Sequence, residues 1–183
     1  RTLVEPVSVV EAGSMTESKI VLVTGASSGI GAAVATRLAA AGHHVVAGAR
    51  RTDRLTDLAH SVEGTGGSIE TRRLDVTDLA DVTAFVDAAV AAHGRVDVIV
   101  NNAGVMPPER TESPQGHEMT LACHVLGPHL MTSLLRDLLV AGPASVVWMS
   151  SGGMYGASLH ARDADDLEFR RGEYDGVQAY ART

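Results

Sequence analysis

The stretch Thr24-Gly25-Ala26-Ser27-Ser28-Gly29-Ile30-Gly31 decides how the rest of this sequence is interpreted. A short apolar run, 20–24, leads into it, and an alanine-rich segment of helical length follows it. Its glycines allow the backbone to turn tightly and approach a pyrophosphate, whose charge is stabilised by the free amides and dipole of a helix start. Tight turns also collect glycines, but the flanking strand and helix are the context that a dinucleotide-binding turn requires. The residues predicted to bind the cofactor here are Thr24, Gly25, Ser27, Ser28, Gly29, Ile30 and Gly31, with the three hydroxyl groups as extra donors.

Apolar β-branched runs and alanine-rich segments continue to alternate as far as residue 150. This alternation predicts an α/β fold, a Rossmann-type doubly wound parallel sheet in which crossover helices join the strands. The predicted strands are 20–24, 44–49, 68–73, 96–101 and 144–150, and the predicted helices are 29–41, 52–61, 80–93 and 116–141. Gly42, Gly94 and Gly142 are expected to end helices in the left-handed conformation.

The later part of the chain carries two further expectations. The strand cores Val98-Ile99-Val100 and Val146-Val147-Trp148 are continuously apolar, which predicts strands covered on both faces. Residues 152–176 mix acidic and basic side chains without a clear period. We expect that segment to be an exposed loop over the carboxyl edge of the sheet.

Length and charge limit the classes of protein. The 183 residues, 45% of them hydrophobic, fit one domain, which we assign to 15–183. Residues 1–14 lack a periodic pattern and are expected to be a disordered leader. The net charge of −7 and the scattered basic side chains argue against a nucleic-acid partner. Apolar runs stay below the roughly 18 residues of a membrane span, so we expect no membrane insertion.

Cysteine and histidine usage add two expectations. Cys123 lies in an apolar helical segment and is predicted to be a buried structural thiol, which suits a reducing, cytoplasmic environment. The histidines at 43, 44, 117, 124, 129 and 160 show no paired spacing with carboxylates on one face. No metal site is therefore predicted.

Arg50 and Arg51 follow the second predicted strand, about twenty residues past the glycine turn. An NAD site usually offers a carboxylate to the adenosine ribose at this position. An arginine pair instead suits a 2′-phosphate through charge-assisted hydrogen bonds, so NADP is favoured over NAD. The alternative is that both arginines are solvated residues at the entry of a helix.

With these motifs the chain resembles the short-chain dehydrogenase/reductase family, in the branch with T-G-x-x-x-G-x-G. Asp75-Val76 matches the family's adenine contact, and Asn101-Asn102-Ala103-Gly104 matches its N-N-A-G signature. The resemblance implies cofactor contacts from Asp75, Val76, Asn102, Ala103 and Gly104. The segments 121–132 and 146–153 are also similar to the subgroup around dehydrogenase/reductase member 12.

The resemblance also implies a reaction and its residues. The family transfers hydride between nicotinamide and a carbonyl or alcohol carbon of a small molecule, while a tyrosine phenol exchanges the oxygen's proton. Tyr180 is the expected acid/base and Ser151 the residue that polarises the substrate oxygen. Tyr155 and Tyr174 are rivals without a lysine four residues later.

Two departures from the family pattern leave alternatives open. His124 stands where the family usually has an asparagine that holds a water, and it is either a proton relay or a hydrogen-bonded core residue. The lysine of Tyr-x-x-x-Lys would fall one position after Thr183, and the family's last strands and dimer helix would follow it. The function expected is an NAD(P)-dependent oxidoreductase, which would form homo-oligomers only at full length. The alternative is a truncated, non-catalytic dinucleotide-binding protein.

Overall fold

The computed structural model describes residues 17–156 and 166–183, so the predicted leader at 1–14 lies outside the described residues. A five-stranded parallel sheet with the order β3-β2-β1-β4-β5 forms its centre. The strands are β1 (Ile20–Thr24), β2 (His44–Ala49), β3 (Ser68–Arg73), β4 (Val98–Asn101) and β5 (Ser145–Trp148). The predicted Rossmann-type sheet is confirmed. The chain crosses back after β3 to place β4 beside β1, and ligands bind at such a switch point in open α/β sheets.

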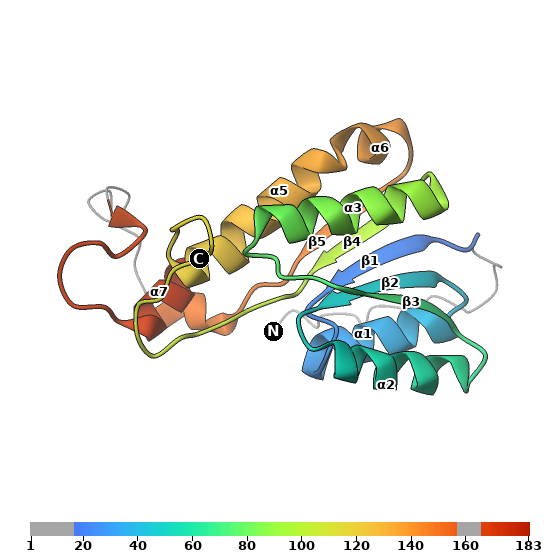
Figure 1. Ribbon diagram of the computed structural model, residues 1–183, viewed down its shortest axis with the longest axis horizontal. Coiled ribbons are helices and arrows are strands. Elements are labelled where there is room, and N and C mark those ends of the chain that lie inside the picture. Colours follow the sequence, from blue (N-terminus) through green and yellow to red (C-terminus); the bar gives the residue numbers. More distant parts are fainter. Residues whose placement is uncertain (1–16, 157–165) are drawn as a thin grey trace, which may run out of the picture.

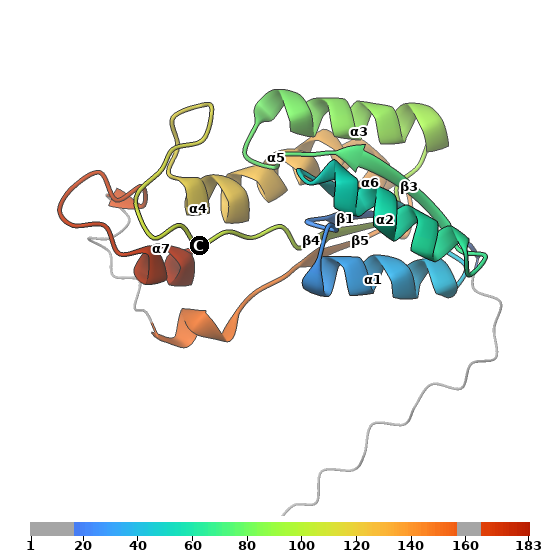
Figure 2. The same ribbon diagram turned by 60° about the horizontal axis from the view of Figure 1, so that its bottom comes forward.

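Helices cover both faces of the sheet (Figures 1 and 2). They are α1 (Gly29–Ala40), α2 (Thr52–Glu63), α3 (Leu79–His93), α4 (Met119–Leu121), α5 (Gly127–Leu134), α6 (Arg136–Ala141) and α7 (Gly176–Arg182), with a π-helical turn η1 (Ala122–Leu126) and a 3₁₀ helix η2 (Gly152–Gly156). In Figure 1, α3 and α5 lie above the sheet and α1 and α2 lie below it. The short helix α7 lies beyond the carboxyl ends of the strands, near η2.

Two apolar cores follow from the alternation of side chains along the strands. Leu22, Val46 and Ile99 point to the α3 and α5 side, where Phe85 packs on them. The alternate positions of the same strands face α1 and α2 in the second core, which includes the buried Leu55. Except for the first residue of each, the residues of the three central strands are buried, as a doubly wound sheet requires.

The predicted helix 116–141 is interrupted, and its first residue is wrong. Glu118 caps the start of α4 by accepting hydrogen bonds from the backbone of Thr120 and Leu121 at 3.0 and 2.8 Å, so the helix begins at Met119. Pro128 has no N–H to donate to the carbonyl four residues earlier, that of His124. The missing bond explains why the helix widens into the π turn η1 before α5.

Gly142 does not adopt the left-handed conformation that was expected. Gly42 and Gly94 have φ angles of 88° and 65°, as predicted, whereas Gly142 has φ −148° and ψ −179°. Pro143 follows it, and proline disfavours helical conformations in the residue before it. The chain therefore leaves α6 in an extended conformation.

The prediction that β5 is covered on both faces is wrong for the described residues. Val146, Val147 and Trp148 are 38%, 40% and 48% exposed, because β5 is the last strand of the sheet and pairs only with β4. β4 begins two residues later than predicted, and β5 is shorter than predicted at both ends. Among the residues described, the longest helices are too short or too polar to cross a bilayer.

Candidate functional site

The glycine turn is built by close approach to the segment that follows β4. A Cβ atom on Gly25, whose φ is +67°, would lie 2.8 Å from Ala103 Cα. One on Gly31 would lie 2.5 Å from both Asn102 Nδ2 and the carbonyl oxygen of Gly25. Gly29 has φ +56° and open space beside it, so its backbone is accessible from outside. These positions need glycine, and the turn leaves amides at the start of α1 free for an anion.

Thr24 does not serve as a hydroxyl donor to that anion, contrary to expectation. Its side chain is buried, and Oγ1 accepts the N–H groups of Asn102 and Ala103, each at 3.0 Å. The Asn102 amide in turn donates to the Thr24 carbonyl at 3.0 Å. Thr24 and Asn102 therefore hold the ends of β1 and β4 together, which fixes the floor of the site.

A cavity of about 430 Å³ opens beside the turn. Its lining includes Gly25, Ser27, Ser28, Arg50, Arg51, Asp75, Val76, Asn102, Ala103 and Gly104. The Arg51 guanidinium reaches back over the turn: Nη2 donates to Ser27 Oγ at 2.9 Å and to Ser28 Oγ at 2.6 Å. A cation and two hydroxyls thus meet at one corner of the cavity, which is the donor set that a phosphate group prefers.

The lining of this cavity also includes an acidic and an apolar side chain, Asp75 and Val76. Asp75 Oδ1 accepts from the backbone N–H of Thr77 at 3.0 Å and from its hydroxyl at 2.7 Å, which fixes the carboxylate next to Val76. Cys123 closes the cavity at depth, and burial raises the pKa of its thiol to about 12. The thiol is therefore protonated and inert near neutral pH, as a structural cysteine should be.

A second cavity of about 370 Å³ adjoins the first. Asn102, Ala103 and Gly104 line both cavities, and Ile30, His124, Ser151 and Tyr180 line the second. One elongated ligand can therefore extend from Arg51 to Tyr180 along the segment after β4. Among the predicted turn residues, Gly29 and Gly31 do not line either cavity. They contribute through the conformation of the backbone described above.

Ser151 and Tyr180 both lie next to Gly153. A Cβ atom on Gly153 would be 3.5 Å from Ser151 Oγ and 3.6 Å from Tyr180 Cε1. Ser151 Oγ accepts the Gly153 N–H at 3.2 Å, which holds the hydroxyl at the mouth of the second cavity. Ser150, the other serine of the pair, donates to Met154 Sδ at 3.3 Å and supports the turn, as expected.

His124 is a hydrogen-bonded, partly buried residue that also contacts the predicted acid/base. The N–H of Val105 donates to Nε2 at 3.1 Å, so Nδ1 carries the proton and donates to Thr183 Oγ1 at 2.8 Å. Its ring meets the Tyr180 ring edge-on, with centroids 5.1 Å apart. Burial lowers the pKa of His124, so the ring is neutral near pH 7. The two roles left open by the sequence, core residue and proton relay, are compatible with this position.

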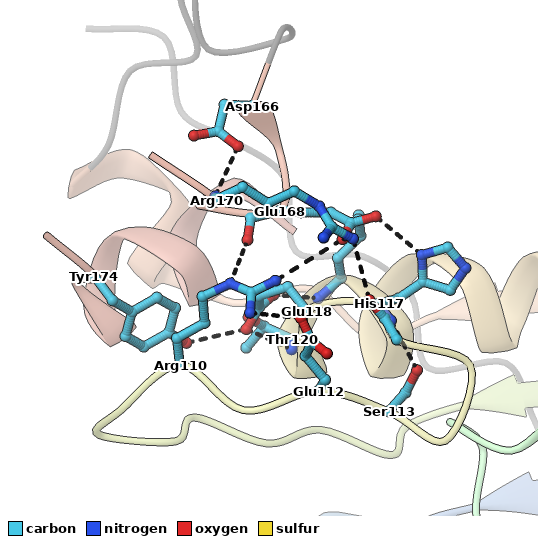
Figure 3. Close-up of polar contacts among 12 residues, drawn as sticks. Arg110, Glu112, Ser113, His117, Glu118, Thr120, Asp166, Glu168, Arg170 and Tyr174 are labelled. Carbon is cyan, nitrogen blue, oxygen red and sulfur yellow. Dashed lines mark hydrogen bonds and ion pairs between the residues drawn. The ribbon is translucent and has the colours of Figure 1, made fainter. Parts of the chain in front are cut away.

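A polar network that sequence reasoning missed holds α7 in place (Figure 3). Glu168 accepts from His117 Nδ1 at 2.9 Å and pairs with Arg170, and its backbone carbonyl accepts from Arg110 Nε at 2.9 Å. Hydrogen bonding by His117 holds the pKa of Glu168 below its usual range. The network joins 110–118 to 166–174, and the second segment leads directly into α7 and Tyr180. No spacing in the sequence signals it, because its partners lie about fifty residues apart.

The two rival tyrosines are placed away from catalytic positions. Tyr174 donates its hydroxyl to Oε1 of the fully buried Glu118 at 3.0 Å, as part of the same network. Burial raises the pKa of Tyr174, which makes it a poorer acid. Tyr155 is 88% exposed on η2.

Asp166 caps the turn at 166–171, whereas Asp163 and Asp165 lie outside the described residues.

Comparison with known proteins agrees with this geometry. The model of a family described as short chain dehydrogenase matches residues 19–160. The chain belongs to this family. The predicted family membership is confirmed, while the finer likeness to dehydrogenase/reductase member 12 stays a prediction.

Several members of the short-chain dehydrogenase family are similar over most of this chain. A probable oxidoreductase of Streptomyces lividans is 39% identical over 162 residues, which are 87% of this chain and 52% of that protein. Human retinol dehydrogenase 13 is 31% identical and covers 90% of this chain and 50% of its own length. A metagenomic short-chain oxidoreductase solved in complex with NADP superposes with a TM-score of 0.70 at 28% identity, covering 92% of this chain and 71% of that one. The chain thus spans about half the length of these curated relatives.

Proposed function

We propose that this chain is the nucleotide-binding and catalytic part of an NADP-dependent oxidoreductase that interconverts a small carbonyl compound and its alcohol. The observation that carries the proposal is the pair of adjoining cavities. The first offers hydrogen-bond donors for a phosphate at Arg51, and the second is lined by the hydroxyl-bearing residues Ser151 and Tyr180. The Streptomyces lividans relative and the NADP-bound metagenomic neighbour support the same class of reaction.

The first cavity fits a dinucleotide because the turn is shaped for one. The Cβ positions of Gly25 and Gly31 are filled by the segment after β4, which exposes amides at the start of α1 to a pyrophosphate. Asp75 and Val76 would contact the adenine, while Arg50 and Arg51 with Ser27 would bind the 2′-phosphate that distinguishes NADP from NAD. When bound, the cofactor supplies or accepts the hydride.

The chain's own residues would handle the substrate oxygen and its proton. In the reducing direction the carbonyl carbon gains a hydride, and the carbonyl oxygen takes a proton from the Tyr180 hydroxyl. Ser151 donates a hydrogen bond to the same oxygen and so stabilises the negative charge that develops on it. His124 lies against the Tyr180 ring and fixes its orientation. The single buried thiol, Cys123, suits a reducing compartment, and we place the protein in the cytoplasm.

The test is a titration of the chain with NADPH and NADH, followed by intrinsic fluorescence or calorimetry. NADPH should bind more tightly, and Arg51→Ala should weaken it by about 10- to 100-fold, because hydrogen bonds to a charged group contribute roughly 1.5–3 kcal/mol. NADH affinity should hardly change. Arg54→Ala, an exposed arginine one turn along α2, is the matched control and should behave as the wild type.

A second arm separates binding from chemistry. Tyr180→Phe should retain NADPH affinity and lose turnover of any accepted carbonyl substrate, since only the transferable proton is removed. Equal affinity of the wild type for NADPH and NADH would reject the NADP assignment. NADPH binding with no turnover across a broad carbonyl panel would instead support the non-catalytic alternative.

A further inference from the structure

Three side chains that can ligate a metal meet at the amino edge of the sheet, opposite the nucleotide cavity. His93 Nε2 lies 3.2 Å from Glu70 Oε2, and His44 Nε2 lies 4.0 Å from the same oxygen. The two imidazole rings have their centroids 4.6 Å apart. One ligand atom from each residue falls within 4.8 Å of the other two. None of the three takes part in the proposed reaction.

The elements of the fold bring these residues together. His44 begins β2 and Glu70 is in β3, on the face of the sheet that α3 covers, and His93 is the last residue of α3. Because they come from three different elements, no spacing in the sequence indicates the cluster. For this reason the sequence alone did not predict a metal site.

The surroundings orient the ligand atoms toward one point. His44 Nδ1 is hydrogen-bonded to Ser68 Oγ at 2.5 Å, which fixes the ring so that Nε2 faces the other two residues. That Nε2 atom is buried and has no hydrogen-bond partner within the described part of the chain. Arg72 occupies the other carboxylate oxygen of Glu70, Oε1, and so leaves Oε2 directed at the histidines. A hydrogen bond to the ring nitrogen that does not face the ion is typical of metal-ligating histidines.

We propose that His44, Glu70 and His93 form a binding site for a divalent transition metal ion, with zinc as the reference ion. Two imidazoles and one carboxylate are a ligand set that zinc uses when a fourth position is left to water. Ligand atoms about 2.0–2.1 Å from a tetrahedral ion lie about 3.3 Å apart, so the cluster needs to contract by roughly 1 Å. Side-chain exposures of 25%, 25% and 16% leave the ion a route in from solvent.

The site is at the far edge of the sheet from the cavities, so its effect is on stability. An ion there links the paired strands β2 and β3 to the carboxyl end of α3, which otherwise contacts Glu70 only through His93 in this cluster. Binding requires neutral histidines. Burial and the neighbouring His93 lower the pKa of His44, which keeps its ring available near neutral pH.

The experiment is calorimetric titration of the untagged, EDTA-dialysed chain with zinc chloride, with melting temperature as a second measurement. We expect one zinc ion per chain with a Kd on the order of micromolar, and a melting temperature several degrees higher at about 100-fold excess over Kd. Cobalt should give the visible absorption of a four- or five-coordinate ion. Each of His44→Gln and His93→Gln should weaken binding at least tenfold, and Ser68→Ala should weaken it about tenfold through the ring orientation.

His129→Gln, which alters an exposed histidine on α5, is the matched control and should bind zinc as the wild type does. Glu70→Gln keeps the shape of the carboxylate side chain and should also lose affinity, so the proposal stays testable if a histidine variant fails to fold. Two results would overturn it. One is a wild-type chain that binds less than half an equivalent of zinc, because the cluster is then only an ion pair between His93 and Glu70. The other is unchanged affinity in the folded members of the ligand series.

Discussion

His124 connects three parts of the site through one side chain. Val105 lies after β4, Thr183 follows α7, and Tyr180 presents its ring to the imidazole. The ring can make both hydrogen bonds only when it is neutral, because Nε2 has to accept while Nδ1 donates. A protonated ring would turn the Nε2 acceptor into a donor that faces the Val105 N–H. Protonation of His124 should therefore loosen the position of α7.

The first prediction concerns the pH dependence of stability. The pKa of His124 is lowered in the folded protein, so the unfolded chain binds the proton first as pH falls below about 6.5. The free energy of unfolding should decrease between pH 7.5 and pH 5.5. His124→Asn should show a smaller decrease, with a difference of at most about 1.4 kcal/mol per pH unit. Urea unfolding of both proteins at the two pH values measures it.

His44 also has a lowered pKa, but it is present in both proteins and cancels from the difference. His129→Asn, on the surface of α5, provides the control and should follow the wild-type curve. Parallel pH curves for wild type and His124→Asn would show that the imidazole is not held neutral by the fold.

Many residues that line the first cavity could be predicted from the sequence, but the contacts that each of them makes could not. The glycines and serines of one turn predict the site, and Arg51 does hydrogen-bond to Ser27 and Ser28. Thr24 belongs to the same motif, but its hydroxyl points away from the expected anion. It accepts hydrogen bonds from two backbone amides of the segment after β4. A period-2 pattern places a side chain on a face of a strand, and tertiary partners decide what it binds.

Among the elements, the segment 166–175 holds α7 against the body of the protein, a role that its amino-acid composition does not predict. Charged residues without a period suggest an exposed loop, and Arg170 and Arg171 are indeed exposed. Glu168 is different: its side chain is only 20% exposed and bonds to His117 and Arg170. This contact and the bond from Tyr174 to Glu118 attach the segment before α7 to the body of the protein (Figure 3).

The second prediction tests whether this network positions Tyr180. Glu168→Gln keeps the size of the side chain and removes the charge that pairs with His117 and Arg170. Amide hydrogen exchange in α7 should become roughly tenfold faster, because a lost hydrogen bond to a charged group lowers the local opening free energy. Exchange in α3 should stay the same. Glu173→Gln, an exposed neighbour, is the control.

The same network should respond to acid. The pKa of Glu168 is below its usual value, so its contribution is complete above the unfolded pKa and is lost as pH falls through the folded one. Exchange in α7 of the wild type should approach that of Glu168→Gln on acidification. If α7 is equally protected in wild type and variant at neutral pH, the ion pairs do not hold the helix.

Elements were predicted well where local chemistry agrees with the fold and poorly where a proline or a contact overrides it. α1, β2 and α3 lie within two residues of their predicted bounds, since a turn or glycine marks each end. Pro128 and Pro143 explain the two errors at the π turn and at Gly142. A further reason is visible at Gly127: a Cβ there would lie 2.2 Å from the Val76 carbonyl oxygen. Such a close contact between distant segments leaves no periodic signal.

In the molecule as one unit, the central strands of the sheet are buried, whereas β5 at one edge is exposed. The apolar strand sequences predicted strands covered on both faces, and the central strands confirm this prediction. An apolar run does not, however, show whether a strand is internal or at an edge of the sheet. Val146, Val147 and Trp148 are exposed together on β5, an edge strand that pairs on one side only, with β4. Unpaired apolar edge strands are templates for pairing with another chain.

The last prediction follows from this edge. The chain should self-associate as its concentration rises, and Val147→Lys should reduce the association, because a charged side chain on an edge strand opposes pairing with a second copy. Sedimentation velocity over a range of concentrations measures the change in mean mass. Met106→Lys, which introduces the same charge at a 58% exposed methionine in the loop after β4, should leave association unchanged. If both variants associate like the wild type, or the wild type stays monomeric throughout, β5 is not the contact surface.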